Sequence, residues 1–284
     1  MIKKLNKILV FDLDGTLLNS KKQILESSRI WIEKAKQQHF LIIFCSGRSL
    51  IDIIEYQKKY NIVDYIVANN GSYWYKTKTQ ETKIINYLDS DTAKTILDKL
   101  KRFDPLVVVN GINRIIHFKY SNETMVDNFY KTVIDKEKNF FNRDYSFTHQ
   151  HALDFIENNK TLQIGALFKK YSFDEVVNDF KELDNINIFY SASKYIDINA
   201  RGVSKYNGIK ELCKDQNLNF DNIYFFGDSG NDHELLEKAK YSYAMDNADI
   251  LTKQKAKYVI GDHDNDSIAK TIEKILEENN VRNN

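Results

Sequence analysis

The sequence of 284 residues predicts an α/β protein, with a doubly wound parallel sheet as its core and an inserted α+β cap domain. Three observations lead to this prediction. Short continuous apolar runs each end in a polar cluster. Helical spacing of apolar residues lies between these runs. The middle of the chain carries strand patterns that mostly lack such clusters.

The apolar runs predict strands that are buried on both faces, and therefore a parallel sheet. The runs occupy residues 8–11, 41–45, 65–68 and 223–226, with weaker members at 241–245 and 258–260. Apolar residues at helical spacing fall within residues 25–35, 50–57, 235–239 and 268–276. In such alternating sheets ligands bind beyond the carboxyl ends of the strands, which is where the polar clusters lie.

The middle of the chain predicts a second domain that is mainly antiparallel. Strand patterns occur at residues 106–109, 113–118, 161–168, 186–190 and 195–198, and helices are expected at 92–101 and 173–182. Asn110-Gly111 is a hairpin turn signal. We therefore expect a core made of residues 1–83 and 196–284, with a cap domain at 84–195.

The charge balance excludes some classes of partner. Lys plus Arg number 41 and Asp plus Glu number 40, giving a net charge of +1 with both signs interspersed. That balance argues against nucleic acid or a membrane as the main partner. No long apolar stretch and no signal-peptide pattern is present, so a cytoplasmic protein is expected. Cys45 and Cys213 belong to no CxxC pair, and no disulfide is expected.

Two pairs of acids follow two of the predicted strands. Asp12 and Asp14 follow the first run, and Asp228 and Asp232 follow the run at 223–226. Converging carboxylates repel one another, and a hard divalent cation such as Mg²⁺ relieves the repulsion. A helix cap or turn is the alternative for one acid, but two pairs in the same position favour a metal site. An EF-hand is rejected because Thr16 holds its fifth position and strands flank the motif.

Ser46-Gly47-Arg48 follows the second strand and precedes a helix, a position that suits phosphate. Ser46 could equally be an ordinary helix N-cap. Cys45 raises the alternative of a thiol phosphatase, but Arg48 is too close to it and a buried core residue is expected. Lys205 opens a predicted helix, from which its side chain could reach phosphate and carboxylates together.

Four motifs carry a resemblance to a known family. They are FDLDGT at residues 11–16, CSGR at 45–48, GVSK at 202–205 and GDSGND at 227–232. In this order and approximate spacing they resemble the haloacid dehalogenase superfamily. More narrowly, the chain resembles the Cof-type phosphatases, whose α/β cap of the C2 type is inserted between the second and third motifs. The resemblance covers nearly the whole chain.

The resemblance implies a role for each acid. Asp12 would be the nucleophile that forms an aspartyl-phosphate, and Asp14 the general acid and then the general base. Mg²⁺ would be held by the Asp12 carboxylate, the Asp14 backbone carbonyl and Asp228. Asp232 would complete the metal site by orienting the lysine or a metal-bound water. The neighbouring charges should raise the pKa of Asp14, as an acid at neutral pH requires.

The resemblance also implies the phosphate-binding residues, which are Leu13, Ser46, Gly47, Lys205 and Asn231. Lys205 would also act catalytically, supplying positive charge with Mg²⁺. Two positions depart from the family pattern. Tyr206 replaces the usual glycine after the motif lysine, and Asp246 stands where a loop usually has glycine. Both put the choice of substrate in doubt.

The predicted function is hydrolysis of small phosphate monoesters, such as sugar phosphates or cofactor-like and nucleotide-like phosphates, by a Mg²⁺-dependent phosphatase. A phosphomutase is the alternative, and it would need a second phosphate site, for which Arg102, Arg114 and Arg143 are candidates. A non-catalytic phosphometabolite-binding protein is a further alternative. His149 and His151 could line the substrate. A monomer or a homodimer is expected.

Overall fold

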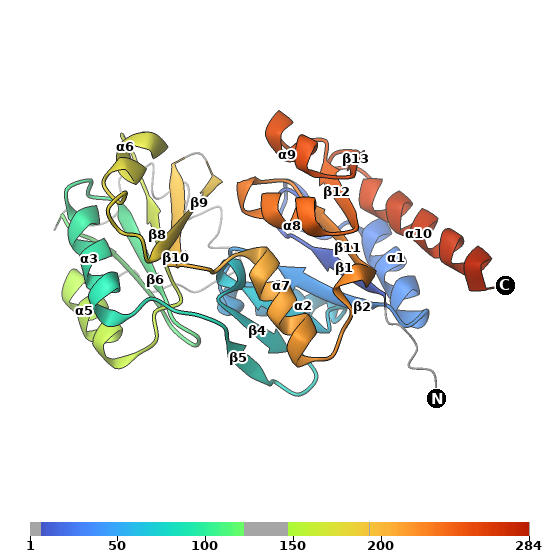
Figure 1. Ribbon diagram of the computed structural model, residues 1–284, viewed down its shortest axis with the longest axis horizontal. Helices are drawn as coiled ribbons and strands as arrows, with labels where there is room; N and C mark the ends of the chain where they lie inside the picture. The colour runs from blue at the N-terminus through green and yellow to red at the C-terminus, as the bar shows by residue number, and fades with distance from the viewer. Residues whose placement is uncertain (1–6, 122–146, 193, 284) are drawn as a thin grey trace.

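The computed structural model describes residues 7–121, 147–192 and 194–283 (Figure 1). Two sheets organise these residues. The first has eight strands in the order β13-β12-β11-β1-β2-β3-β4-β5, and the second has five in the order β7-β6-β8-β10-β9.

The first sheet is doubly wound, as predicted. Its strands are β1 Ile8–Phe11, β2 Leu41–Cys45, β3 Tyr65–Ala68, β4 Tyr73–Lys76, β5 Thr82–Ile84, β11 Ile223–Gly227, β12 Tyr241–Met245 and β13 Tyr258–Ile260. The helices around it are α1 Glu26–Gln37, α2 Leu50–Tyr60, α7 Lys205–Asp215, α8 His233–Lys238, α9 Ile250–Lys255 and α10 Ser267–Asn283. Side chains of α1, α2 and α10 pack on one face, and those of α7 and α8 on the other.

This packing explains the unbroken apolar runs. In β1, Leu9 and Phe11 point into the hydrophobic cluster below α1 and α10, whereas Ile8 and Val10 point into the cluster below α7 and α8. Both faces of the strand are therefore buried, and every position must be apolar.

The sheet is not parallel throughout, which corrects the prediction in one respect. β4 pairs antiparallel with β3, and β5 pairs antiparallel with β4. This hairpin has no clear signal in the sequence because β5 is short, partly charged and largely exposed. It extends the sheet at the edge from which the chain leaves for the second domain (Figure 1).

The second sheet is antiparallel and has helices on one face, so the predicted α+β cap is confirmed in kind. Its strands are β6 Leu106–Asn110, β7 Ile115–Lys119, β8 Gln163–Leu167, β9 Ile186–Ala192 and β10 Tyr195–Ala200. Its helices are α3 Ser90–Lys101, α5 His149–Asn158 and α6 Phe173–Asn178. They pack on the apolar face of the sheet, at the left of Figure 1. The sequence did not predict α5.

The predicted return to the core at residue 196 falls inside a strand of the cap. Residues 195–200 form β10, which pairs with β8 and β9 of the second sheet. The strand is apolar and alternating, so the sequence did not show to which sheet it belongs. No helix in the described parts of the chain combines the length and the apolar character needed to cross a bilayer.

Candidate active site

Three neighbouring strands end at the same edge of the core sheet. β11, β1 and β2 are adjacent and parallel. Asp228, Asp12 and Ser46 are the residues that directly follow them. The sheet therefore brings the first, second and fourth sequence motifs to one edge, as the parallel topology predicts.

Lys205 joins two of the acids. Its Nζ donates to Asp12 Oδ1 at 2.6 Å and to Asp232 Oδ1 at 2.7 Å, and its side chain is fully buried. Burial alone would lower the pKa of Lys205, but the charges of Asp12 and Asp232 outweigh it and hold the pKa above its usual range. The lysine is therefore charged at neutral pH.

Asp12, Asp228 and Asp232 form a compact acidic cluster. One carboxylate oxygen from each lies within 4.8 Å of the others. Burial raises the pKa of Asp12 well above its usual value. The charge of Lys205 offsets this rise only in part, and the charges of Asp232 and Asp228 add to it. Burial and the charge of Asp232 raise the pKa of Asp228 to about 7. Such a cluster of hard oxygen donors fits a divalent cation, which would stabilise the ionised carboxylates.

The turn after Asp14 allows this cluster to close. Gly15 has φ +77°, and a methyl group placed on it would lie 2.3 Å from Asp228 Oδ2. Only glycine fits both the backbone conformation and the space. Thr16 Oγ1 donates to Asp228 Oδ1 at 2.7 Å and so orients that carboxylate.

Both oxygens of Asp232 accept hydrogen bonds from the protein. Oδ1 accepts from Lys205, while Oδ2 accepts from the backbone N–H groups of Asp228 and Ser229, each at 3.0 Å. These contacts favour a positioning role for Asp232 over direct metal binding. Its role remains a prediction.

The carboxylate of Asp14 is not one of the three grouped in the acidic cluster, and it pairs with two cations instead. Arg48 Nε donates to Asp14 Oδ2 at 2.5 Å, and Lys22 Nζ donates to Oδ1 at 2.6 Å. Burial opposes ionisation, but the charges and hydrogen bonds of Arg48 and Lys22 outweigh it and hold the pKa of Asp14 well below its usual range. The predicted rise in this pKa is therefore wrong for this conformation, because sequence spacing could not show that two cations reach the carboxylate.

The predicted phosphate-binding residues lie close to this site, and all except Gly47 are buried. Ser46 Oγ accepts from the Arg48 backbone N–H at 3.2 Å, which shapes the loop. Gly47 and Asn231 both approach Asn70, whose Oδ1 accepts from Asn231 Nδ2 at 2.9 Å. The Leu13 side chain is buried in the core cluster, so only its backbone could contact phosphate.

Three residues that raised questions in the sequence, Cys45, Tyr206 and Asp246, have contacts of a structural kind. Cys45 is buried, and burial raises the pKa of its thiol above its usual range, which disfavours the thiolate that a thiol phosphatase needs. Both cysteines are free. Tyr206 packs edge-on against the ring of Phe220. Asp246 is largely exposed and pairs with Lys253 at 2.8 Å.

The cap histidines do not line this site. His149 and His151 lie in the first turn of α5, on the face of the cap sheet that carries the helices. The ring of His149 packs against Phe118 and Tyr120. Their position on helix α5 does not support a role in lining the substrate, which was the less favoured of two interpretations beside histidines exposed on the cap.

Other residues at the site were missed from the sequence. They are Lys22, Gln163 and Asp197. Asn69 and Asn70 follow the run at 65–68, so they belong to a polar cluster expected at this edge, but the sequence assigned them no role. One signal was available for Asp197. A charged residue between Ile196 and Ile198 in a predicted strand is unusual for a sheet face that is merely structural.

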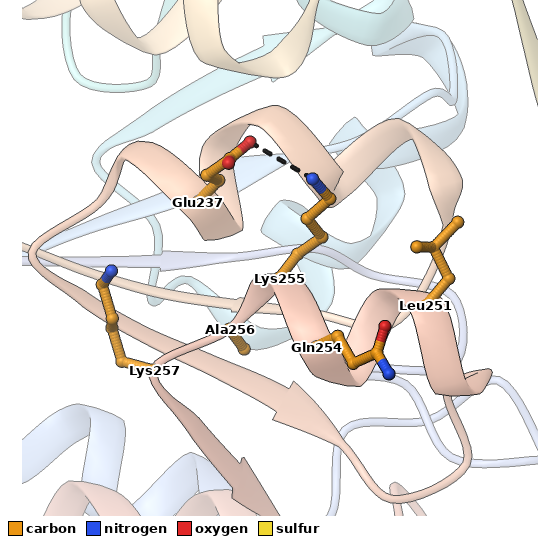
Figure 2. Close-up of a pocket in the computed structure, with 6 residues that line it drawn as sticks. All are labelled: Glu237, Leu251, Gln254, Lys255, Ala256 and Lys257. Atoms are coloured by element: carbon orange, nitrogen blue, oxygen red, sulfur yellow. Dashed lines mark ion pairs between the residues drawn. The ribbon is translucent and has the colours of Figure 1, made fainter.

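A pocket of about 390 Å³ lies elsewhere, beside α9. Its lining is Glu237, Leu251, Gln254, Lys255, Ala256 and Lys257, and Lys255 pairs with Glu237 at 3.5 Å (Figure 2). None of these six residues is a predicted site residue. The site at the strand ends therefore rests on the buried acids and lysine, and not on this pocket.

This protein combines a doubly wound core, a buried cluster of acids with a lysine, and an inserted cap. That combination is typical of one class of hydrolase. The chain belongs to the haloacid dehalogenase-like hydrolase family, whose sequence pattern matches residues 9–272. The predicted resemblance to this superfamily is thereby confirmed. So is the predicted class of enzyme, since the curated relatives are named as phosphatases.

Two relatives from Escherichia coli illustrate the similarity. The chain is 25% identical to a 5-amino-6-(5-phospho-D-ribitylamino)uracil phosphatase over 281 residues, covering 95% of this chain and 96% of the relative. It is 26% identical to a pyridoxal phosphate phosphatase over 295 residues, covering 94% and 97%.

Among solved structures, a sugar phosphatase of haloacid dehalogenase subclass IIB is similar in fold. Its TM-score is 0.82 at 21% identity, with 95% of this chain and 99% of that chain covered. A haloacid dehalogenase-like hydrolase from B. subtilis has a TM-score of 0.81 at 21% identity, with 94% and 99% covered. At these identities the likeness confirms the fold.

Proposed function

We propose that this protein is a Mg²⁺-dependent phosphatase that hydrolyses small phosphate monoesters through an aspartyl-phosphate on Asp12. The observation that carries the proposal is the contact of Lys205 Nζ with Asp12 Oδ1 at 2.6 Å, beside Asp228 and Asp232. A buried cation next to a buried carboxylate at the end of a strand is suited to bringing an anionic nucleophile to an anionic phosphate.

The donor set fits a divalent cation. The Asp12 carboxylate, the Asp14 backbone carbonyl and Asp228 would hold it, and Asp232 would position Lys205. When bound, the cation would supply positive charge that offsets the repulsion among carboxylates and phosphate.

Two covalent steps follow from this arrangement. In the first, an Asp12 carboxylate oxygen forms a bond to phosphorus, the ester P–O bond breaks, and the leaving oxygen takes a proton from Asp14. In the second, water attacks the phosphorus and gives a proton to Asp14, and the bond between Asp12 and phosphorus breaks to release phosphate. Lys205 stabilises the phosphoryl oxygens in both steps.

Asp14 must be freed before it can serve as the acid. Its carboxylate is held by Arg48 and Lys22 and is 37% exposed. An incoming phosphate ester is also an anion and would compete for the same two cations. We infer that substrate binding draws Arg48 and Lys22 from Asp14, which lets its pKa rise and its side chain take up a proton.

The relatives indicate the range of possible substrates. Two relatives are named as phosphatases of a phosphoribitylamino-uracil and of pyridoxal phosphate. The solved structure with a similar fold is named as a sugar phosphatase. All are small phosphorylated metabolites, and we propose a substrate of that size for this chain.

The described residues offer little support for the alternative that the protein is a phosphomutase. Arg102 pairs with Asp179 at 2.6 Å, and Arg114 lies over the ring of Phe147 at 5.3 Å. Both guanidinium groups are engaged elsewhere in the cap. Arg143 lies outside the described residues. No observation therefore favours a second phosphate site at the first two arginines.

The Asp12→Asn substitution tests the proposal. It removes the nucleophile but keeps the side-chain volume, so turnover of p-nitrophenyl phosphate with Mg²⁺ should fall on the order of 10⁴-fold or more. Asp246→Asn is the matched control, since that acid is largely exposed and paired with Lys253, and its activity should stay near wild type. Activity of Asp12→Asn within tenfold of wild type, with an unchanged circular dichroism spectrum, would contradict the mechanism. Tight binding of phosphate esters without turnover by the wild type would favour the non-catalytic alternative.

A further inference from the structure

The core sheet ends in a strand whose outer side is open. β13 (Tyr258–Ile260) pairs with β12 on one side and, among the described residues, with no strand on the other. It lies at the edge of the core, close to α9 (Figure 1). An open edge presents unpaired backbone N–H and C=O groups, which can pair with a strand of another molecule.

Large apolar side chains are exposed at this edge. Among the described residues, the four of this kind with the highest exposure lie on two consecutive elements. They are Ile250 and Leu251 of α9 and Tyr258 and Val259 of β13, exposed by 77%, 53%, 53% and 51%. Successive residues of a strand point to opposite faces, so β13 exposes apolar surface on both sides of the sheet. Such a concentration of apolar side chains marks a candidate interaction surface.

The opposite edge of the same sheet is different. β5 exposes Thr82 and Lys83, and the ammonium group of Lys83 pairs with Asp215 at 2.5 Å. A lysine on an edge strand opposes pairing with another sheet. Of the two edges of the core, only β13 therefore offers an apolar surface to a partner.

A row of stacked rings also ends at β13. Phe11, Phe226, Tyr243 and Tyr258 lie opposite one another on four neighbouring strands, and consecutive ring centroids are 4.9, 4.8 and 5.2 Å apart. Phe226 and Tyr243 each have a ring on either side. Within the part of the chain that the structure describes, Tyr258 is stacked only on the side of Tyr243. A side chain from a neighbouring molecule would cover its outer side.

The charges on either side of β13 indicate which molecule fits. Lysines precede the strand and aspartates follow it, namely Lys253, Lys255 and Lys257, then Asp262, Asp264 and Asp266. When two identical strands pair antiparallel, the residues before the strand in one copy lie near the residues after the strand in the other. The lysines of each copy would thus lie near the aspartates of its partner. A parallel arrangement would bring like charges together, which is destabilising.

The two charges nearest to the strand are available for this contact. Lys257 is exposed, and its side chain has no ion-pair partner among the described residues. Asp262 Oδ1 accepts only from the backbone N–H of Asp264, at 2.7 Å. Lys255 is 3.5 Å from Glu237, and such a partly exposed pair contributes little and can be exchanged for another.

We propose that β13 is the contact surface of a homodimer, in which it pairs antiparallel with β13 of a second copy about a two-fold axis. The core sheets of both copies would then form one continuous sheet. A two-fold contact uses the same surface on both copies, as the opposite charges on the two sides of β13 require. Because β13 has 3 residues, the contact is small, and we expect a dimer that dissociates on dilution.

Sedimentation velocity of the full chain tests the proposal, from about 1 µM to about 500 µM. The wild type should change from monomer to dimer over this range. Tyr258→Glu should raise the dissociation constant at least about tenfold, because it removes the exposed ring and brings two like charges to the strand pair. Tyr87→Glu is the matched control, since Tyr87 is 40% exposed and follows β5 at the opposite edge, and the dissociation constant should be unchanged.

A pair of charge reversals makes the test specific for two antiparallel copies. Lys257→Glu or Asp262→Lys alone gives both sides of β13 a like charge at these positions, so either variant should dimerise at least about tenfold more weakly than the wild type. An equimolar mixture of the two variants should form a mixed dimer, because both contacts then join opposite charges again.

The results that contradict the proposal are distinct. A wild type that is monomeric at every concentration overturns it, even if a different protein then binds this edge. Equal dissociation constants for Tyr258→Glu and Tyr87→Glu also overturn it. A mixture of the charge variants that is no more dimeric than each variant alone rejects the antiparallel arrangement. If Tyr258→Glu does not fold, as judged by circular dichroism, the charge variants decide. No measurement depends on turnover, so the outcome is independent of the proposed phosphatase function.

Discussion

Lys205 is the residue on which the buried charges of the site depend. Its ammonium group is the partner of Asp12 and Asp232, and all three side chains lie within the protein. Removing one partner from a buried ionic group leaves the other charges without compensation, which costs far more than the group contributed by itself. The lysine should therefore matter for stability as well as for chemistry.

Lys205→Met tests this point. The substitution should lower the free energy of unfolding by about 3 kcal/mol, since Asp12 and Asp232 lose a buried cation. Urea denaturation of the metal-free protein would measure the change. Lys214→Met on the same helix is the control, because Lys214 is 74% exposed and should change the value by less than about 0.5 kcal/mol.

A double substitution makes the test sharper. Adding Asp12→Asn to Lys205→Met removes one of the carboxylates left unpaired, so the combined loss should be smaller than the sum of the two single losses. Strict additivity would show that the two side chains do not interact as the 2.6 Å contact implies.

At the scale of elements, β10 is tied to the core by side chains and not by sheet pairing. Asn199 Nδ2 donates to the Asn69 carbonyl, to Ser72 Oγ and to the Leu162 carbonyl, at 3.0 to 3.1 Å. One buried amide thus joins a cap strand to the 3-10 turn η1 (Asn69–Gly71) after β3, and to the residue before β8. This contact fixes the cap sheet against the core next to Asn70.

Asn199→Ala should therefore destabilise the protein by about 2 kcal/mol, because the substitution removes several buried hydrogen bonds, including the one that Asn199 Oδ1 accepts from Asn70 Nδ2 at 3.2 Å. Thermal denaturation would measure it. Asn158→Ala is the control, since Asn158 is exposed on α5 and bonds only within its own helix. A loss for Asn199→Ala no larger than that of the control would show that the amide does not join the two parts.

At the scale of the whole molecule, the acidic cluster proposed to bind a metal links protonation to folding. The pKa of Asp228 is about 7 in the folded protein, above the value near 4 expected for an unfolded chain. Between these values the folded form binds more protons, so the stability of the metal-free protein falls as pH rises through this window. A Mg²⁺ ion at the proposed site would need the ionised carboxylates and would compete with those protons.

The stabilisation by Mg²⁺ should therefore be larger at about pH 8 than at about pH 5, since fewer protons oppose binding. With Mg²⁺ about a hundredfold above its dissociation constant, the stabilisation should reach about 3 kcal/mol, a rise of roughly 5 °C or more in Tm. Scanning calorimetry with Mg²⁺ and with EDTA measures it. Asp228→Asn should lose most of the effect. An equal shift at both pH values would contradict the linkage.

The sequence by itself determined the core sheet and the main acids. Strands buried on both faces are apolar along their whole length, and polar residues follow them where the chain leaves the sheet. Asp12, Ser46 and Asp228 could therefore be placed at one edge of the sheet from local pattern alone. The placement of Lys205 beside Asp12 agrees with the resemblance, although the assigned roles remain proposals.

Only the tertiary structure decided the partners of these residues. Arg48 reaches Asp14 from 34 residues further along the chain, and Lys22 reaches it from a turn eight residues away, and neither contact has a signal in the sequence pattern. Asp197 meets Gly47 because a separate sheet docks on the core. Local pattern fixes which face of a strand is buried. Which charge lies next to which depends on how distant elements pack, and that packing lowers the pKa of Asp14 and brings Gln163 of the cap to the Gly47 carbonyl.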